Sequence, residues 1–94
     1  MPKLEDAQIF EQFGNGDPAK GREIAGRIAQ RLIHARKKHP TFAVGRFHAL
    51  GEMNKEFVEF QKAVEDESPE RQDEEALDCT AVTFRWLGGE YNNH

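Results

Sequence analysis

Apolar residues recur every three or four positions over most of this 94-residue chain, a spacing that is typical of amphipathic helices and unlike the alternation of a strand. Long helices are predicted for residues 18–38, about 43–66 and 69–87, and a shorter one for about 4–13. Asp17 and Ser68, each followed by proline, are N-cap signals for the first and third long helices, and two glycines end the third. We therefore expect an all-α fold, a small helical bundle of three long helices plus a short N-terminal helix.

The second long helix carries the clearest apolar stripe, and we expect this stripe to form its main core contact. Its members are Phe47, Leu50, Met53, Phe57, Phe60 and Val64. The third long helix is apolar on two sides, which is typical of a helix that is central in a bundle or shared with a partner subunit. One side carries Leu77, Ala81 and Phe84, and the other carries Cys79, Val82 and Trp86.

The composition limits the class of protein. Hydrophobic residues make up 37% of the chain and charged residues 32%, so the core is thin for a monomer and we expect oligomerisation to complete it. The net charge of -4 is unfavourable for non-specific binding to nucleic acid. The single cysteine, Cys79, allows neither an internal disulfide nor a zinc site. No apolar run is long enough to span a membrane and the N-terminal segment lacks the centre of a signal peptide, so we expect a cytoplasmic protein with no membrane partner.

Two acidic pairs are the strongest candidates for a functional site. They are Glu56-x-x-Glu59 on the second long helix and Glu75-x-x-Asp78 on the third. A spacing of i, i+3 puts both members of a pair on one side of a helix. If the two helices pack antiparallel, four carboxylates can point at one place, where their mutual repulsion favours a bound cation. Hard oxygen ligands suit Mg²⁺ or Mn²⁺. We therefore predict a metal site and, with it, a phosphate-bearing substrate.

The order and spacing of these motifs resemble the catalytic core of the MazG-like, all-α nucleoside triphosphate pyrophosphohydrolases, which carry Glu-x-x-Glu, a spacer and then Glu-x-x-Asp. The segment 55–64, Lys-Glu-Phe-Val-Glu-Phe-Gln-Lys-Ala-Val, is similar to the first motif helix, and the segment 74–81, Glu-Glu-Ala-Leu-Asp-Cys-Thr-Ala, is similar to the second. Lys38-His39-Pro40 resembles a turn between helices in many members. The likeness implies a single MazG-like helical domain over residues 1–94, with its core at about 20–87.

The resemblance implies a Mg²⁺-dependent enzyme that cleaves a nucleoside triphosphate, with ribose or deoxyribose, into the monophosphate and pyrophosphate. Its metal ligands and catalytic residues would be Glu56, Glu59, Glu75 and Asp78, with Mg²⁺ or alternatively Mn²⁺ between them. Which carboxylate binds the metal and which activates water stays open. Candidates for contacts with phosphate are Lys55, Lys62 and Arg85. The resemblance, together with the two-sided third helix, also implies a homodimer or homotetramer in which a partner subunit closes the pocket.

Other interpretations stay open. Lys55 stands where many members have a further glutamate, which favours a MazG-like fold kept as a non-catalytic, oligomeric interaction module. The four carboxylates would then form a solvated helix face paired with nearby cations.

A nucleic-acid-binding domain would use the basic residues of the first long helix, but these are spread around it without a helix-turn-helix signature. They are Arg22, Arg27, Arg31, Arg36, Lys37 and Lys38. A di-iron bundle needs Glu-x-x-His, and no glutamate here has a histidine three residues later.

Overall fold

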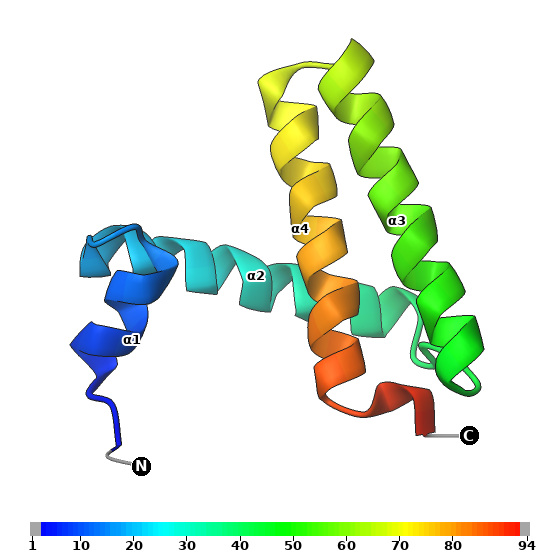
Figure 1. The fold of residues 1–94 in the computed structure, drawn as a ribbon, viewed down its shortest axis with the longest axis horizontal. Coiled ribbons are helices and arrows are strands. Elements are labelled where there is room, and N and C mark those ends of the chain that lie inside the picture. Colours follow the sequence, from blue (N-terminus) through cyan, green and yellow to red (C-terminus); the bar gives the residue numbers. More distant parts are fainter. Residues whose placement is uncertain (1–2, 93–94) are drawn as a thin grey trace. The chain divides into compact units, whose positions relative to one another are not determined.

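A computed structural model describes residues 3–92 of the chain (Figure 1). Its helices are α1 (Asp6–Phe13), α2 (Pro18–Lys38), α3 (Arg46–Asp66) and α4 (Pro69–Leu87), followed by a short 3-10 helix, η1 (Glu90–Asn92). No strand occurs within the described residues, so the predicted all-α fold with three long helices and a short N-terminal one is confirmed. No helix in this range is both long enough and apolar enough to cross a membrane. The first two residues of the segment considered as a signal peptide lie outside the described range.

Helix α3 begins at Arg46, later than the predicted residue 43, because the segment before it takes a non-helical course. Gly45 has a φ of 91°, a conformation that glycine adopts without the steric cost other residues have. The backbone N–H of Val44 donates a hydrogen bond to Nδ1 of His48 over 3.0 Å. The non-helical course leaves Phe42 and Ala43 buried just before the helix.

The chain divides into two compact units, and the division falls within α2. The first unit, up to residue 30, contains a close approach of α1 to the start of α2. A Cβ atom on Gly21 would lie 1.8 Å from the carbonyl oxygen of Phe10, so only glycine fits at this contact. Asp17 caps α2 as predicted, since its Oδ1 accepts a hydrogen bond from the N–H two residues later over 3.0 Å. The second unit begins at residue 31 and contains every residue of the site described below. The single domain over residues 1–94 stays a prediction.

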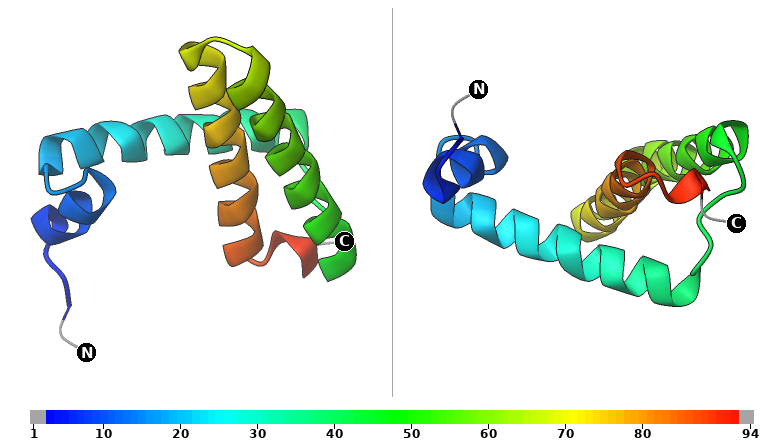
Figure 2. Two further views of the ribbon diagram at one scale, coloured as in Figure 1. Left: turned by 45° about the horizontal axis from the view of Figure 1, so that its top comes forward. Right: turned by 90° about the horizontal axis from the view of Figure 1, so that it is seen from below.

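Helices α3 and α4 lie side by side and antiparallel, joined by a short turn (Figures 1 and 2). Ser68 caps α4 as predicted, and its Oγ accepts a hydrogen bond from the N–H of Arg71 over 3.4 Å. The buried residues of these two helices include three alanines, Ala49, Ala63 and Ala81. The core cluster consists of Phe42, Ala43 and Ala49, against which Met53, Val82, Trp86 and Tyr91 pack. The alanines allow the close approach of the helices that brings the two acidic motifs together.

The prediction that the large apolar stripe of α3 forms its core contact is wrong for the single chain. Phe47 is 90% exposed, Leu50 57%, Phe57 53% and Val64 53%, whereas Met53 and Phe60 are half-buried. The physical reason is that the alanines on the adjacent side of α3 are the residues that are buried, and short side chains permit closer contact of backbones than phenylalanines do. Phe47, Leu50, Phe57 and Val64 therefore form an exposed surface, which we call the outer face of α3. Helix α4 is also only partly covered, because Val82 and Trp86 pack on the core while Phe84 is 41% exposed.

A buried arginine ties the segment after α2 to the end of α4. The side chain of Arg85 is 3% exposed, and its Nε donates a hydrogen bond to Oε1 of Glu90 over 2.8 Å. Its Nη2 donates to the carbonyl oxygen of His39 over 2.9 Å. Arg36 contacts the other carboxylate oxygen of Glu90, with Nη2 at 2.8 Å. Partial burial alone would raise the pKa of Glu90, but hydrogen bonds from Arg36 and Arg85 outweigh it and hold the pKa below the usual range.

Candidate functional site

Three of the four predicted motif carboxylates lie together. Glu56 on α3 and Glu75 and Asp78 on α4 each offer an oxygen atom, and these three atoms lie within 4.8 Å of one another. We call these residues the carboxylate cluster. Glu59 is exposed and lies outside this group, one turn further along α3. The antiparallel packing of α3 on α4 thus brings together one member of the first motif and both members of the second.

Burial and mutual repulsion make the cluster unfavourable for negative charge. Glu75 is 8% exposed, and Glu56 is half-buried. Burial raises the pKa of Glu56, and the negative charges of Asp78 and Glu75 raise it further. The pKa of Glu75 is also raised, first by burial and then by Asp78. A cation placed among the three oxygens would relieve both effects.

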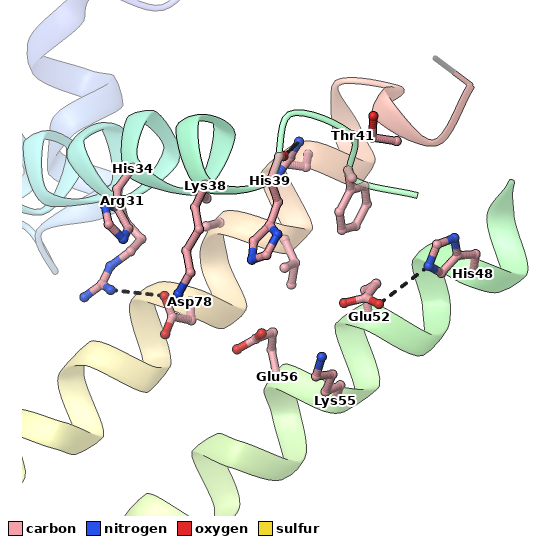
Figure 3. Close-up of a pocket in the computed structure, with 15 residues that line it drawn as sticks. Arg31, His34, Lys38, His39, Thr41, His48, Glu52, Lys55, Glu56 and Asp78 are labelled. Carbon is pink, nitrogen blue, oxygen red and sulfur yellow. Dashed lines mark hydrogen bonds and ion pairs between the residues drawn. The ribbon is translucent and has the colours of Figure 1, made fainter. Parts of the chain in front are cut away.

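Two arginines already supply positive charge at the edges of the cluster. Nη2 of Arg71 lies 2.6 Å from Oε1 of Glu75, one turn away on the same helix. Nη1 of Arg31, near the middle of α2, lies 3.2 Å from Oδ1 of Asp78 (Figure 3). The contact of Arg71 fixes the direction of the Glu75 carboxylate, and the contact of Arg31 joins α2 to α4.

The cluster opens on a cavity of about 450 Å³ within the second unit, a size within the range of small-molecule sites, roughly 300–1,000 Å³. Glu56 and Asp78 line it from α3 and α4. Figure 3 shows Arg31, Lys38 and His39 reaching toward these two carboxylates from α2 and the residue after it. The remaining lining includes His34, Ala35, Thr41, Phe42, His48, Glu52, Lys55, Ala81, Val82 and Arg85. The cavity therefore has an acidic side and a basic side, which suits a ligand that carries a metal ion and phosphate groups together.

The residues predicted to contact phosphate have three different placements. Lys55 lines the cavity, next to Glu56 on α3. Lys62 is exposed and is not among the lining residues. Arg85 lines the cavity, but its guanidinium group is engaged with Glu90 and with the carbonyl oxygen of His39. The structure thus gives Arg85 a stabilising role inside the fold and leaves Lys55 as the predicted cation best placed for a ligand.

Sequence reasoning missed the contribution of α2 to the site. Arg31, His34 and Lys38 line the cavity, and the i, i+3, i+7 spacing that places them on one side of a helix is visible in the sequence. This signal was hidden because basic residues occur all around α2. His39, which directly follows the last residue of α2, lines the cavity as well.

The donor set fits a hard divalent cation. Three carboxylate oxygens can supply part of the octahedral shell of Mg²⁺, which usually keeps several waters and binds substrate phosphate as well. The guanidinium group of Arg31 beside Asp78 shows that this position accepts a positive charge. Glu56, Glu75 and Asp78 are therefore the residues that would hold Mg²⁺ or Mn²⁺ in this chain.

Trp86 and His48 both make structural contacts. The ring of Trp86 packs against Tyr91, with centroids 4.6 Å apart, and both residues pack against the core cluster. Nδ1 of His48 accepts the hydrogen bond from Val44, and its Nε2 lies 3.6 Å from Oε1 of Glu52. These contacts organise the first turn of α3 at the rim of the cavity.

The chain matches no protein-family model, no curated protein and no solved structure. The likeness to the MazG-like pyrophosphohydrolases therefore rests on the two acidic motifs, their order and their spacing.

Proposed function

We propose that this protein is a Mg²⁺-dependent nucleoside triphosphate pyrophosphohydrolase of the MazG-like type, which converts a (d)NTP and water into the (d)NMP and pyrophosphate in the cytoplasm. One observation carries this proposal: carboxylates from both acidic motifs lie within 4.8 Å of one another, and two of them line a cavity whose opposite side is basic. This division of charge supports a triphosphate substrate, because a triphosphate needs both a metal ion and cationic side chains to offset its own charge.

In the proposed reaction, water attacks the α-phosphorus and the bond from that phosphorus to the α–β bridging oxygen breaks. One proton of the water leaves, and pyrophosphate carries away the bridging oxygen. Glu56, Glu75 and Asp78 would hold the metal, which when bound neutralises phosphate oxygens and lowers the pKa of a coordinated water. Arg71 keeps Glu75 in place. Glu59, the motif carboxylate outside the cluster, is then the candidate to accept the proton from water.

The proposal is tested by incubating the purified protein with canonical and modified dNTPs and NTPs plus Mg²⁺, and measuring pyrophosphate. We expect release with at least one nucleotide, and a loss of roughly 100-fold or more for Asp78→Asn and for Glu59→Gln. Glu65→Gln, an exposed substitution on the same helix α3, is the matched control and should retain activity. Circular dichroism establishes that each variant is folded. No pyrophosphate with any nucleotide, together with no binding of Mg²⁺ or Mn²⁺ by calorimetry, would reject the enzyme; full activity in Asp78→Asn would reject the site.

A second candidate function is that of an oligomeric interaction module, either alone or combined with catalysis. The observation that favours it is the outer face of α3, where Leu50, Phe57 and Val64 are all more than half exposed. They follow one another at intervals of seven residues, which is the spacing of one seam position in a coiled coil. Exposed large apolar side chains in a row are typical of an interface between proteins. We propose that a second copy of the chain covers this face in a homodimer or homotetramer.

Light scattering coupled to size-exclusion chromatography tests the association. The unmodified protein should have the mass of a dimer or tetramer, and Phe57→Ser should lower this mass toward that of the monomer. Ile33→Ser is the matched control, because Ile33 is similarly exposed, 56% against 53%, but lies on α2. A monomer at concentrations of about 100 μM, or an oligomer that Phe57→Ser leaves intact, would reject an interface at the outer face of α3.

A further inference from the structure

Arg31 lies at the boundary between the acidic and basic sides of the cavity. Its Nη1 atom is 3.2 Å from Oδ1 of Asp78, and the two side chains are 25% and 32% exposed. Asp78 is also one of the three residues whose oxygens lie close enough together to hold a metal ion. Arg31 and a bound cation would therefore compete for the same carboxylate.

The same side of α2 offers a second cation to the cavity. Lys38 follows Arg31 by seven residues, lines the cavity, and extends toward Asp78 in Figure 3. The two basic residues that lie between Arg31 and Lys38 in the sequence are used differently: Arg36 is paired with Glu90, and Lys37 is not among the lining residues. Of the arginines and lysines from residue 31 to residue 38, the ones that line the cavity are thus Arg31 and Lys38.

If Arg31 lost its contact with Asp78, its guanidinium group would remain inside the cavity, next to the site at which the metal ion binds. Arginine binds phosphate with two parallel N–H···O bonds, and its planar group lowers the entropy lost for each hydrogen bond that forms. A polyphosphate bound to the metal would bring negative charge close to Arg31. At the same time the metal ion would replace Arg31 as the positive charge that contacts Asp78. Both exchanges keep each charge paired, so neither leaves a partly buried charge without a partner.

We propose that Arg31 changes partner, from Asp78 in the metal-free protein to a phosphate group of the metal-bound polyphosphate, and that Lys38 binds the same polyphosphate. This inference rests on the proposed function and deepens it, because it assigns substrate contacts to α2 that neither acidic motif contains. Removing the charge of Arg31 should therefore have two opposite effects. It should strengthen binding of the metal alone and weaken binding of polyphosphate in the presence of the metal.

The experiment is calorimetric titration of the whole chain with Mn²⁺, first alone and then at saturating Mn²⁺ with inorganic triphosphate as the probe. For Arg31→Gln we expect the Kd for Mn²⁺ to fall by roughly two- to fivefold, since a partly exposed ion pair no longer competes. The Kd for triphosphate should rise by roughly tenfold or more, because a hydrogen-bonded charge is lost. Lys38→Gln should weaken triphosphate in the same direction with a smaller effect on Mn²⁺, and Lys37→Gln should change neither.

Each outcome decides one proposal. Mn²⁺ affinity that is unchanged or lower in Arg31→Gln overturns the competition for Asp78. Triphosphate affinity that is unchanged in Arg31→Gln overturns the change of partner, and equal effects of Lys37→Gln and Lys38→Gln overturn the assignment of Lys38. If the unmodified protein binds no Mn²⁺, the proposed function fails at the metal site and this inference fails with it; if it binds Mn²⁺ and Arg31→Gln behaves identically, only this inference fails.

Discussion

Replacing Arg85 by methionine should destabilise the protein by about 3 kcal/mol, and this prediction separates a structural role for Arg85 from a role in substrate binding. The side chain is 3% exposed and makes hydrogen bonds of 2.8 Å to Glu90 and 2.9 Å to the carbonyl oxygen of His39. Breaking a buried ion pair by removing one partner costs roughly 3–5 kcal/mol. We take the lower end of this range because Glu90 keeps its contact with Arg36. Methionine fills a similar volume, so the loss measures polar contacts more than packing.

The assay is urea unfolding followed by circular dichroism. A loss of about 3 kcal/mol is a large part of the roughly 5–15 kcal/mol that stabilises a typical domain. Arg85→Met combined with Glu90→Gln gives a double-mutant cycle, in which we expect a coupling energy above about 1 kcal/mol. Lys55→Met, an exposed side chain of the same cavity, is the control and should change stability by less than about 0.5 kcal/mol. An Arg85→Met protein of unchanged stability that has lost nucleotide binding would refute the structural role and restore Arg85 as a substrate contact.

Two further predictions concern the acidic cluster and the first unit. Glu56→Gln should raise the melting temperature of the metal-free protein at pH 7, because burial and nearby carboxylates raise the pKa of Glu56 above its usual 4.5. The charged form of Glu56 is then the one that destabilises the fold. The increase in melting temperature should shrink as pH falls through the raised pKa and vanish below about pH 4.5. An increase that stays constant from pH 7 to 4 would contradict a raised pKa of Glu56 as its cause. Gly21→Ala should destabilise the protein by about 1–3 kcal/mol, because a Cβ atom there meets the backbone of α1. Gly26→Ala is the control on the same helix: a Cβ atom there meets nothing within 4 Å, so the variant should be neutral or stabilised by up to about 1 kcal/mol. Urea unfolding compares the two variants, and equal effects would show that the close approach of α1 to α2 is absent.

The helices could be predicted from the sequence because their signals are local. The apolar spacing, the N-caps Asp17 and Ser68, and the terminating glycines act within a few residues of where they stand. The start of α3 was misplaced because Gly45 adopts a positive φ of 91°, and its N–H donates to the carbonyl oxygen of Tyr91 over 2.9 Å, a contact between residues far apart in the chain. Such a contact leaves no local pattern.

The apolar pattern on α3 was correct as a helix signal and misleading as a core signal. Periodicity shows which residues share a side of a helix, but it does not show which side faces a neighbour. Here Ala49 and Ala63 are buried, while Phe57 and Leu50 are exposed. Closest packing of two backbones selects the small residues, and this choice depends on the neighbouring helix.

For the candidate site, the i, i+3 spacing of Glu75 and Asp78 was enough to place both on one side of α4, and the structure brings Glu56 to them. Spacing alone put Glu59 in the same group, although in the structure Glu59 is exposed and lies outside the carboxylate cluster. The basic side of the cavity depends wholly on long-range packing, since Arg31 meets Asp78 across 47 positions of sequence.

The sequence by itself determined that this protein is built from helices, where most of them begin and end, and that acidic residues recur at helical spacing on two of them. These properties depend on hydrogen bonds and side chains within one or two turns, so they are encoded locally. Only the tertiary structure decided that three of the four carboxylates meet, that Arg85 is buried in an ion pair, that α2 supplies the basic side of the cavity, and that the largest apolar side chains of α3 face outward. Each of these depends on which surfaces of the helices come into contact, and this is set by packing among segments that are distant in the sequence. At these contacts, small side chains and paired charges decide which surfaces are buried more than the size of any single apolar residue does.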